Sequence, residues 1–325
     1  MRGETMKIDV HNHIIPPAVL DLLNRDSTYG VTFPDAAMRT ADGLQFPLVN
    51  SFHDAKAKIK ELAAHGLDGA VLSIAPPAFH YSASPAQGEA LCAAANEGLA
   101  KFARSVPERF RWMAHVPLQQ VDVAVAMLRA AKAQGAVGVE VGTNINGDRL
   151  DAPMFEAFWA AAQELGLLVM LHPTNNAPYP GLADWYLQNA VGNPLETMIA
   201  GCRLICSGLL DRFPSIQILL VHGGGHLPYQ LGRLRHAISV RKELAGVAPD
   251  PWIYAKRMNF DSLTHDAQAL RYLVDRIGAG NIFVGTDLPF DMASPNPIAT
   301  LSAAVDEAQT KLIAETNPAV RFGFS

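Results

Sequence analysis

Four histidines and one aspartate lie in short segments whose residue types suit the binding of a divalent cation. His11 and His13 are separated by one residue, His172 precedes a proline, His222 precedes three glycines, and Asp287 follows Gly-Thr. In an extended chain, residues two apart point to the same side, so both imidazoles of the first pair can face one site. Imidazole and carboxylate ligands suit Zn²⁺, with Mn²⁺, Fe²⁺ or Co²⁺ as alternatives. An open coordination position would hold a water molecule whose pKa the metal lowers to about 7.

Each of these groups stands at the carboxyl end of a predicted β-strand. The strands concerned span residues 7–11, 167–172, 216–222 and 281–286. A single histidine is more often a packing residue, but several histidines and an aspartate at successive strand ends are hard to explain by packing alone. The carboxyl ends of the strands of an α/β barrel meet at one face, where such enzymes place their chemistry. We therefore expect these side chains to meet around one cation.

The chain alternates short apolar runs with amphipathic segments of helix length, which predicts a (β/α)8 TIM barrel. Runs such as 167–171 and 216–221 are apolar throughout, as in strands that are buried on both faces of a parallel sheet. The rival, a doubly wound open sheet, lacks support because no Gly-x-Gly-x-x-Gly follows a strand. The predicted strands are 7–11, 69–74, 111–116, 137–142, 167–172, 216–222, 257–260 and 281–286. The predicted helices are 54–65, 89–104, 122–134, 154–165, 195–213, 227–244, 266–276 and 297–315.

Residues 24–52 depart from this alternation. They are rich in glycine, proline and turn residues, which predicts a small β-rich insertion after the first strand that could cover the site. No linker, repeat or low-complexity tract divides the rest of the sequence. We therefore expect residues 1–325 to form a single barrel domain.

The composition excludes some classes of partner. The chain has 26 basic and 31 acidic residues and a formal charge of −5, so it has no broad cationic field for nucleic acid or an anionic membrane. No apolar run approaches the roughly 20 residues that cross a bilayer. The three cysteines show neither a disulfide framework nor a Cys-x-x-Cys pair. These features predict a cytoplasmic protein that acts on a small molecule, with no nucleic-acid or membrane partner.

Four motifs together resemble a known family. They are Ile-Asp-Val-His-Asn-His-Ile-Ile-Pro (8–16), Leu-His-Pro (171–173), His-Gly-Gly-Gly with Pro-Tyr-Gln-Leu-Gly-Arg (222–233), and Gly-Thr-Asp-Leu-Pro-Phe (285–290). They resemble the aminocarboxymuconate-semialdehyde decarboxylase branch of the amidohydrolase superfamily over residues 7 to about 324. The resemblance implies a Zn²⁺ barrel in which His11, His13, His172 and Asp287 bind the metal. It also implies that His222 is an unligated acid/base residue beside the metal-bound water.

The resemblance extends to residues that would contact substrate. Arg233 matches an arginine that reaches the site of a neighbouring subunit and holds a substrate carboxylate, which implies a homodimer; the alternative is a surface or interface salt bridge. Phe46, Asn189 and Phe290 fall at positions that imply substrate contacts.

The sequence also departs from the branch at the pocket. The second substrate arginine of the family falls on Pro47, which cannot pair with a carboxylate. Two tryptophans of the family's pocket wall fall on Thr174 and Asn189. A smaller, more polar pocket with one cation fewer argues against the substrate after which the branch is named.

Several other titratable residues have less defined roles. Glu140 lies where binuclear relatives place a bridging ligand, but we favour a buried structural pair over a second metal. Asp261, which ends the seventh predicted strand, is expected to support a metal ligand. His226 and His265 stand near strand ends and are predicted to be bystanders, and His80 is predicted to be structural.

The leading interpretation is a metal-dependent, non-oxidative decarboxylase of a small unsaturated or aromatic carboxylic acid. His222 and Asp287 would deliver a proton to the carbon that loses CO₂. An alternative keeps the same mononuclear site but makes it a hydrolase of an amide or lactone, or a hydratase. A third possibility, a barrel without catalytic function, predicts loss of His222 or Asp287, and both are present.

Overall fold

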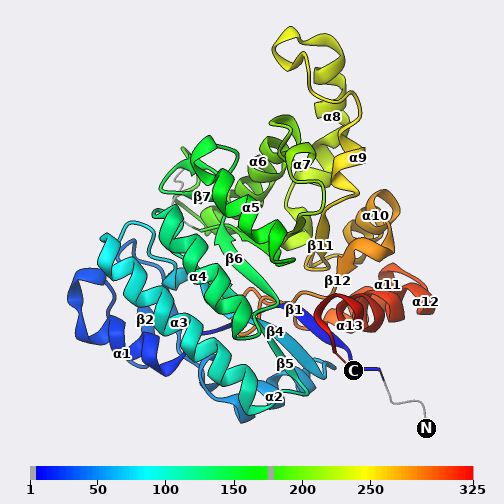
Figure 1. Cartoon of the computed structure of the whole chain (residues 1–325). Helices are drawn as coiled ribbons and strands as arrows, with labels where there is room; N and C mark the ends of the chain where they lie inside the picture. The colour runs from blue at the N-terminus through cyan, green and yellow to red at the C-terminus, as the bar shows by residue number, and fades with distance from the viewer. Residues whose placement is uncertain (1–4, 175–178, 325) are drawn as a thin grey trace.

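The structure is a computed structural model that describes residues 5–174 and 179–324. In these ranges eight parallel strands form one sheet in the order β1-β4-β5-β6-β9-β10-β11-β12. Val10 N donates to Val284 O and His13 N donates to Leu288 O, both at 2.8 Å, so the first strand also joins the segment after the last strand. The sheet therefore closes into the predicted (β/α)8 barrel (Figure 1). The strands are β1 (Ile8–Ile14), β4 (Gly69–Ile74), β5 (Phe110–His115), β6 (Gly138–Gly142), β9 (Leu168–His172), β10 (Gln217–Leu220), β11 (Asn259–Asp261) and β12 (Ile282–Phe283).

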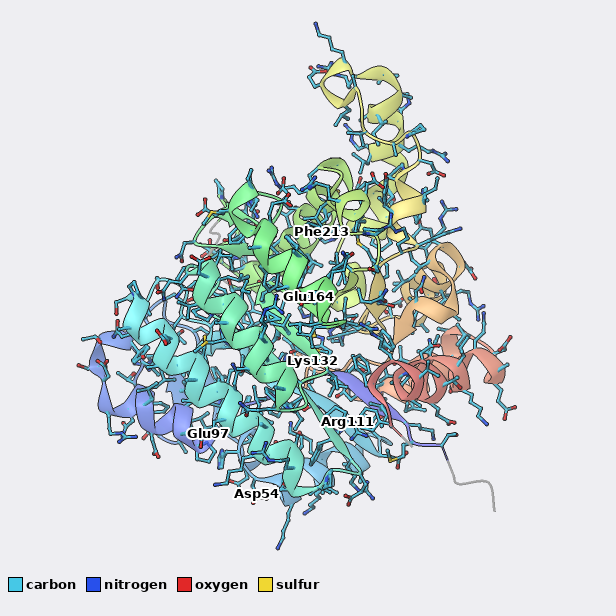
Figure 2. The ribbon with its side chains drawn as sticks, in the orientation of Figure 1. Asp54, Glu97, Arg111, Lys132, Glu164 and Phe213 are labelled. Atoms are coloured by element: carbon cyan, nitrogen blue, oxygen red, sulfur yellow. The ribbon has the colours of Figure 1, made fainter. Side chains whose placement is uncertain are left out.

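Helices cover the outside of the barrel. Figure 2 shows Glu97, Lys132 and Glu164 on α3, α4 and α5, where all three side chains are exposed to solvent. The helices that follow the strands are α2 (Ala55–Ala64), α3 (Pro85–Ser105), α4 (Val121–Ala133), α5 (Glu156–Glu164), α6 (Asn193–Cys206), α8 (Leu227–Val240), α10 (Ala267–Ile277) and α11 (Pro297–Ala304). The additional short helices are α1 (Pro17–Arg25), α7 (Leu209–Arg212), α9 (Pro251–Ala255), α12 (Glu307–Lys311) and α13 (Asn317–Phe322).

Two predicted helices are each divided into two in the structure. The helix predicted at 195–213 is split into α6 and α7, because Gly208 takes the left-handed conformation with φ of 70°. The helix predicted at 297–315 is split into α11 and α12, because Asp306 is extended and accepts a hydrogen bond from Gln309 N as the cap of a new helix.

Successive side chains of each strand point to opposite faces of the sheet, so they pack in two separate apolar clusters. On β9, Leu168 and Met170 belong to a cluster with residues of β1, β10 and the C-terminal segment, whereas Val169 and Leu171 pack in the larger cluster that includes residues of the covering helices. His172 shares the phase of Leu168 and Met170, so it points to the inside of the barrel. The first cluster comprises Ile8, Val10, Val71, Met113, Leu168, Met170, Leu219, Val221, Phe283, Phe322 and Phe324.

An irregularity in β1 sets the direction of the first two histidines. Ile8 and Val10 pack in the inner cluster, and the register with β4 then shifts between Asp9 and Asn12. A bulge of this kind reverses the phase of the residues that follow. His11 and His13 can therefore point inward, although regular alternation from Val10 would have turned both away from the barrel interior.

The predicted insertion is present as a small antiparallel hairpin. It is formed by β2 (Ala37–Arg39) and β3 (Gln45–Pro47), with Met38 opposite Phe46. Two single-turn helices, Ser27–Tyr29 and Asn50–Phe52, flank the hairpin.

Helix α8 and the segment that follows it project outward from the barrel, at the top of Figure 1. This projection includes the 3₁₀ turn η7 (Lys242–Leu244). Within the ranges given above, no helix has both the length and the apolar character that a bilayer crossing requires.

Candidate metal centre and active site

The side chains of His11, His13, His172 and Asp287 come together at the carboxyl ends of their strands. One ligand atom from each residue lies within 4.8 Å of the others, and all four residues are buried. Asp287 Oδ1 lies 3.5 Å from His11 Nε2, 3.1 Å from His13 Nε2 and 4.0 Å from His172 Nε2. The convergence predicted from the strand ends is therefore present in the structure.

The ligand atoms of these residues have no other partner and are therefore suited to bind a cation. In the part of the chain that the structure describes, the Nε2 atoms of His11, His13 and His172 and Oδ1 of Asp287 are buried and have no hydrogen-bond partner. The other ring nitrogens are engaged: His11 Nδ1 with Asp261 Oδ2 at 2.7 Å and His172 Nδ1 with Pro173 O at 2.7 Å. His13 Nδ1 lies 3.1 Å from a serine hydroxyl and 3.3 Å from a carbonyl oxygen. This orientation presents three Nε2 lone pairs to one point, as in metal sites whose histidines are fixed by outer partners.

The protonation of the four residues also suits metal binding. Burial lowers the pKa of His13 to about 4, and burial together with His11 holds the pKa of His172 well below its usual range. Burial would raise the pKa of Asp287, but His11 and His13 hold it well below its usual range. Burial acts against protonation of His11, yet Asp261 and Asp287 raise its pKa to about 9. Protonation of His11 therefore competes with cation binding.

Asp261 connects the metal ligands to the neighbouring loop. Besides His11, its carboxylate accepts hydrogen bonds from the main-chain nitrogens of His222 at 3.0 Å, Gly223 at 2.7 Å and Leu263 at 3.1 Å. Burial opposes its ionisation, but the hydrogen bond and charge of His11 lower its pKa. The contact of Asp261 with a candidate metal ligand, which its predicted role requires, is present, and the structure adds the second connection to His222.

Asp9 has a structural role that is not apparent from the sequence. Its carboxylate accepts from Asn12 Nδ2 at 2.7 Å, from Thr286 N at 3.1 Å, and from the Thr286 hydroxyl at 2.5 Å. It thereby fastens the strand that carries His11 to the segment that carries Asp287. Burial raises its pKa to about 6 although these hydrogen bonds act in the opposite direction.

His222 lies beside the four ligands and outside the quartet. Its Nε2 is 3.7 Å from Asp287 Oδ2, and its Nδ1 is buried without a hydrogen-bond partner among the described residues. The residue has a φ of 56°, and a Cβ at Gly225 would lie 2.1 Å from Pro194 O. The glycines after His222 therefore allow a close turn that aims the imidazole at Asp287.

Glu140 points into the barrel, as its two-residue phase on β6 allows. Its side chain is fully buried, its Oε1 is 3.7 Å from His13 Nδ1, and neither carboxylate oxygen has a hydrogen-bond partner among the described residues. Burial holds its pKa well above the usual range. Within residues 5–174 and 179–324, the quartet is the only group of three or more such side chains that could hold a cation, so a second metal gains no support.

A buried lysine, whose role is also not apparent from the sequence, donates a hydrogen bond to the main chain of the first strand. Lys58 Nζ donates to His13 O at 3.2 Å and to Glu61 Oε2 at 2.9 Å, and Ser51 Oγ donates to Glu61 Oε1 at 2.7 Å. Lys58 is fully buried. A lysine within an amphipathic helix gave no signal in the sequence, because such residues are usually exposed.

The cavity above the quartet has two lobes. The first, of about 340 Å³, lies between His172, His222 and Asp287 on one side and the insertion on the other. The second, of about 530 Å³, shares His222 and Asp287 and extends between α8 and α10. The insertion contributes Tyr29, Thr40, Ala41, Asp42, Leu44, Gln45 and Phe46 to the first lobe.

The predicted substrate contacts have different outcomes. Phe46, Asn189 and Phe290 line the first lobe, and the ring of Phe290 lies edge-on to His13 at 5.6 Å. Thr174 also lines this lobe, whereas Pro47 is exposed and does not. Arg233 is exposed on α8 and lines neither lobe of its own chain, so its action in trans stays a prediction.

Three histidines placed among the bystanders or structural residues line the cavity. His226 and His265 line the second lobe, and His80 lines the first. His80 has a φ of 47°, and its ring contacts that of Tyr29 at 5.4 Å between centroids. Burial lowers its pKa to about 4. The place of His80 in the cavity could not be predicted from the sequence, because it depends on the insertion that packs against it.

The sequence of this chain is similar to those of known proteins. The sequence model of a family described as amidohydrolase matches residues 8–324. The 2-amino-3-carboxymuconate-6-semialdehyde decarboxylase of Dictyostelium discoideum is 30% identical over 94% of this chain and 88% of its own length. The gamma-resorcylate decarboxylase of a Rhizobium species is 30% identical over 80% of this chain and 84% of its own.

A solved structure shares the fold. The crystal structure of dihydroxybenzoic acid decarboxylase from a Polaromonas species, with bound manganese and the inhibitor 2-nitroresorcinol, superposes with a TM-score of 0.77 at 24% identity. The match covers 98% of this chain and 97% of the other.

Proposed function

The chain belongs to the amidohydrolase family, in the branch of the 2-amino-3-carboxymuconate-6-semialdehyde decarboxylases, and from this membership we propose that it is a metal-dependent, non-oxidative decarboxylase. Its substrate is a small unsaturated or aromatic carboxylic acid. The observation that carries the proposal is the meeting of His11, His13, His172 and Asp287 with their ligand atoms free, directly beside His222. The decarboxylase names of the relatives in Dictyostelium and Rhizobium support the reaction class.

The four residues of the quartet would hold one divalent cation. When bound, this cation supplies Lewis-acid stabilisation of the negative charge that develops as the carboxylate leaves. Asp261 keeps the ring of His11 in the orientation and tautomer that present Nε2. Phe46 and Phe290 give the first lobe an apolar wall next to the quartet, which suits a flat unsaturated substrate.

His222 is the proton donor in this proposal. The bond between the carboxylate and the substrate carbon breaks, CO₂ leaves, and the electron pair stays on the carbon, where a proton from His222 replaces the lost group. The carboxylate of Asp287, whose Oδ2 lies 3.7 Å from His222 Nε2, stabilises the protonated ring before transfer. Asp261 fixes the main chain of His222 and so holds the imidazole at this position.

The quartet's three imidazole nitrogens and one carboxylate oxygen suit Zn²⁺, which is our proposed native metal. Mn²⁺ is the rival because the Polaromonas structure contains manganese. Metal analysis of protein purified without added metal decides between them. The cytoplasmic location expected from the sequence stays a prediction.

The reaction is tested on metal-loaded protein with a panel of aromatic and unsaturated acids, with CO₂ release as the readout. His222→Asn is expected to lower the rate by about 10² to 10⁴ while the bound metal stays unchanged. His65→Asn serves as the control, because His65 lies at the C-terminal end of α2 and lines neither lobe.

Reaction in H₂¹⁸O separates this function from hydrolysis or hydration. Decarboxylation transfers only a solvent proton to the product, whereas a hydrolase or hydratase would add labelled oxygen. Labelled product without CO₂ would therefore replace the decarboxylase with the alternative that uses the same site.

A further inference from the structure

Asn193 is the first residue of helix α6, but its side chain does not serve as a cap. Its φ and ψ of −62° and −50° are already helical, and within the described residues no side chain hydrogen-bonds to the start of α6 as a cap. Asparagine favours the start of a helix because its side chain can accept a backbone hydrogen bond there. Asn193 is 9% exposed, and its Oδ1 is buried and has no hydrogen-bond partner in the ranges that the structure describes. The fold therefore leaves this amide oxygen without a structural partner.

Asn193 lies where the two lobes of the cavity meet. Like His222, it lines both lobes. The residue after it packs against the loop that follows His222: Pro194 O accepts a hydrogen bond from His226 N at 3.3 Å, and a Cβ at Gly225 would lie 2.1 Å from the same oxygen. This close packing holds Asn193 at the junction, near the imidazole that we propose as the proton donor.

Two further uncharged polar residues line the cavity. Asn189 stands four residues before Asn193, in the π-helical turn Gln188–Gly192, and also lines both lobes. Thr174 lines the first lobe, is 7% exposed, and has a buried Oγ1 without a hydrogen-bond partner among residues 5–174 and 179–324. A polar group that is buried without a partner lowers stability, so its presence in a cavity wall favours a ligand that supplies the partner.

We propose that Asn193 is a specificity-determining residue whose amide binds a hydroxyl group of the substrate. The inference rests on the proposed function, which places the reacting carboxylate at the metal quartet. A hydroxyl group can donate to Oδ1 and accept from Nδ2, so it can pair with the amide in either orientation of the side chain. A substrate without this group would leave Oδ1 without a partner, so the site should favour hydroxylated acids over analogues that lack the hydroxyl group.

The test compares 2-hydroxybenzoate with the acids that carry one more hydroxyl group: 2,3-, 2,4-, 2,5- and 2,6-dihydroxybenzoate. Binding to the metal-loaded protein is measured by calorimetry, and CO₂ release is followed in parallel. The series places the added hydroxyl group at each free position of the ring in turn, so that one member presents it to Asn193. We expect that member to bind at least about 5-fold more tightly than 2-hydroxybenzoate.

Substitutions of Asn193 examine the cause of this gain in affinity. Asn193→Leu keeps the approximate volume of the side chain and removes the amide, and Asn193→Ala removes the amide with less bulk. In both, the gain should disappear, whereas affinity for 2-hydroxybenzoate should change by less than about 3-fold. Bound metal should stay unchanged, because Asn193 is not one of the quartet. Asn24→Leu is the matched control, because Asn24 is exposed on α1 and lines neither lobe, and it should preserve the gain.

Equal affinity for all the acids in the wild-type protein would overturn the proposal, as would failure of all of them to bind or a gain that persists in both Asn193 variants. A gain that is lost in Thr174→Val and kept in Asn193→Leu would also overturn it and would assign the hydroxyl group to Thr174. If the gain depends on Asn193 but no acid releases CO₂, the hydroxyl site stands and the decarboxylase proposal loses support. If CO₂ is released from acids that bind with equal affinity, the decarboxylase stands and the hydroxyl site is wrong.

Discussion

At the scale of single residues, Asp261 is the position where metal binding and proton transfer depend on the same side chain. Its carboxylate holds the ring of His11 and the main chain of His222. Asp261→Asn keeps the shape but removes the charge. Because it weakens the orientation of His11, we expect metal affinity to fall about 10- to 100-fold.

Competition with a chelator of known affinity measures this loss. Asp266→Asn, which removes a carboxylate from the exposed N-cap of α10, is the matched control and should leave metal affinity unchanged. Unaltered metal affinity in Asp261→Asn would show that the contact with His11 does not support the ligand.

Glu140 is a residue that we expect to lower the free energy of unfolding. It is a fully buried carboxyl group without a hydrogen-bond partner among the described residues. Methionine has a similar length and no polar group, so Glu140→Met should raise the free energy of unfolding of the metal-free protein by about 1–3 kcal/mol. Glu140→Gln, which keeps an unpaired polar group, is the control and should not give this gain.

Denaturant unfolding in the presence of a chelator measures both variants. A Glu140→Met protein that is less stable than the wild type would mean that this carboxyl group has a favourable partner in the fold.

At the scale of the elements, a network ties the hairpin after β6 to helix α6. Glu196, fully buried on α6, accepts hydrogen bonds from Arg149 Nη1 at 2.7 Å and Asn144 Nδ2 at 2.8 Å, and from the hydroxyl of Tyr179. The hairpin consists of β7 (Asn144–Ile145) and β8 (Asp148–Arg149). Tyr179 follows β9 in the sequence, so the network joins a third segment of the chain to the hairpin and the helix.

The pH dependence of stability follows from this network. Burial acts to raise the pKa of Glu196, but Arg149 and Tyr179 lower it below the ordinary value of 4.5. A lowered folded-state pKa adds stability above pH 4.5 that is lost as the pH falls through the folded-state value. Glu196→Gln should therefore lower the free energy of unfolding by about 1–3 kcal/mol at pH 7 and have less effect in acid.

Thermal unfolding between pH 7 and pH 3 measures this difference. Glu164→Gln removes the exposed pair of Glu164 with Arg129 and is the control, with little change expected at either pH. An equal loss of stability for Glu196→Gln at both ends of this range would contradict the assigned ionisation.

The elements also show what the sequence could and could not predict. The eight strands and the quartet were predictable, because apolar runs fix the strands and the barrel gathers their carboxyl ends at one face. The bulge in β1, the break at Gly208, the roles of Asp9 and His80 and the connection of Asp261 to His222 were not. The break depends on a local backbone angle and the others on contacts between segments that are distant in the sequence, and periodicity reveals neither.

At the scale of the whole molecule, the projecting helix α8 is the feature that a second copy would cover. Arg233 is exposed there, and Tyr229, Val240 and Ile253 nearby in the sequence have 78%, 61% and 60% of their surface exposed. We propose a homodimer in which Arg233 acts in the site of the other subunit. Apolar exposure of this kind is typical of an interface.

Mixed subunits test this arrangement. Arg233→Ala and His222→Asn proteins, each inactive alone, should regain about a quarter of wild-type activity after refolding or co-expression together, because half of the dimers then contain one complete site. Light scattering records the dimer. Failure of the mixture to regain activity, with dimers present, would place Arg233 in its own chain's site or outside catalysis.

The pairing of the last strand with the first links the cation to the order in which the chain is made. His11 and His13 are synthesised well before Asp287 and before Thr286, which contacts Asp9. A nascent or truncated polypeptide that lacks residues 282–288 therefore offers a metal only part of the donor set, and the full chelate arises when the last strand meets the first. Metal retention would thus report that the barrel has closed.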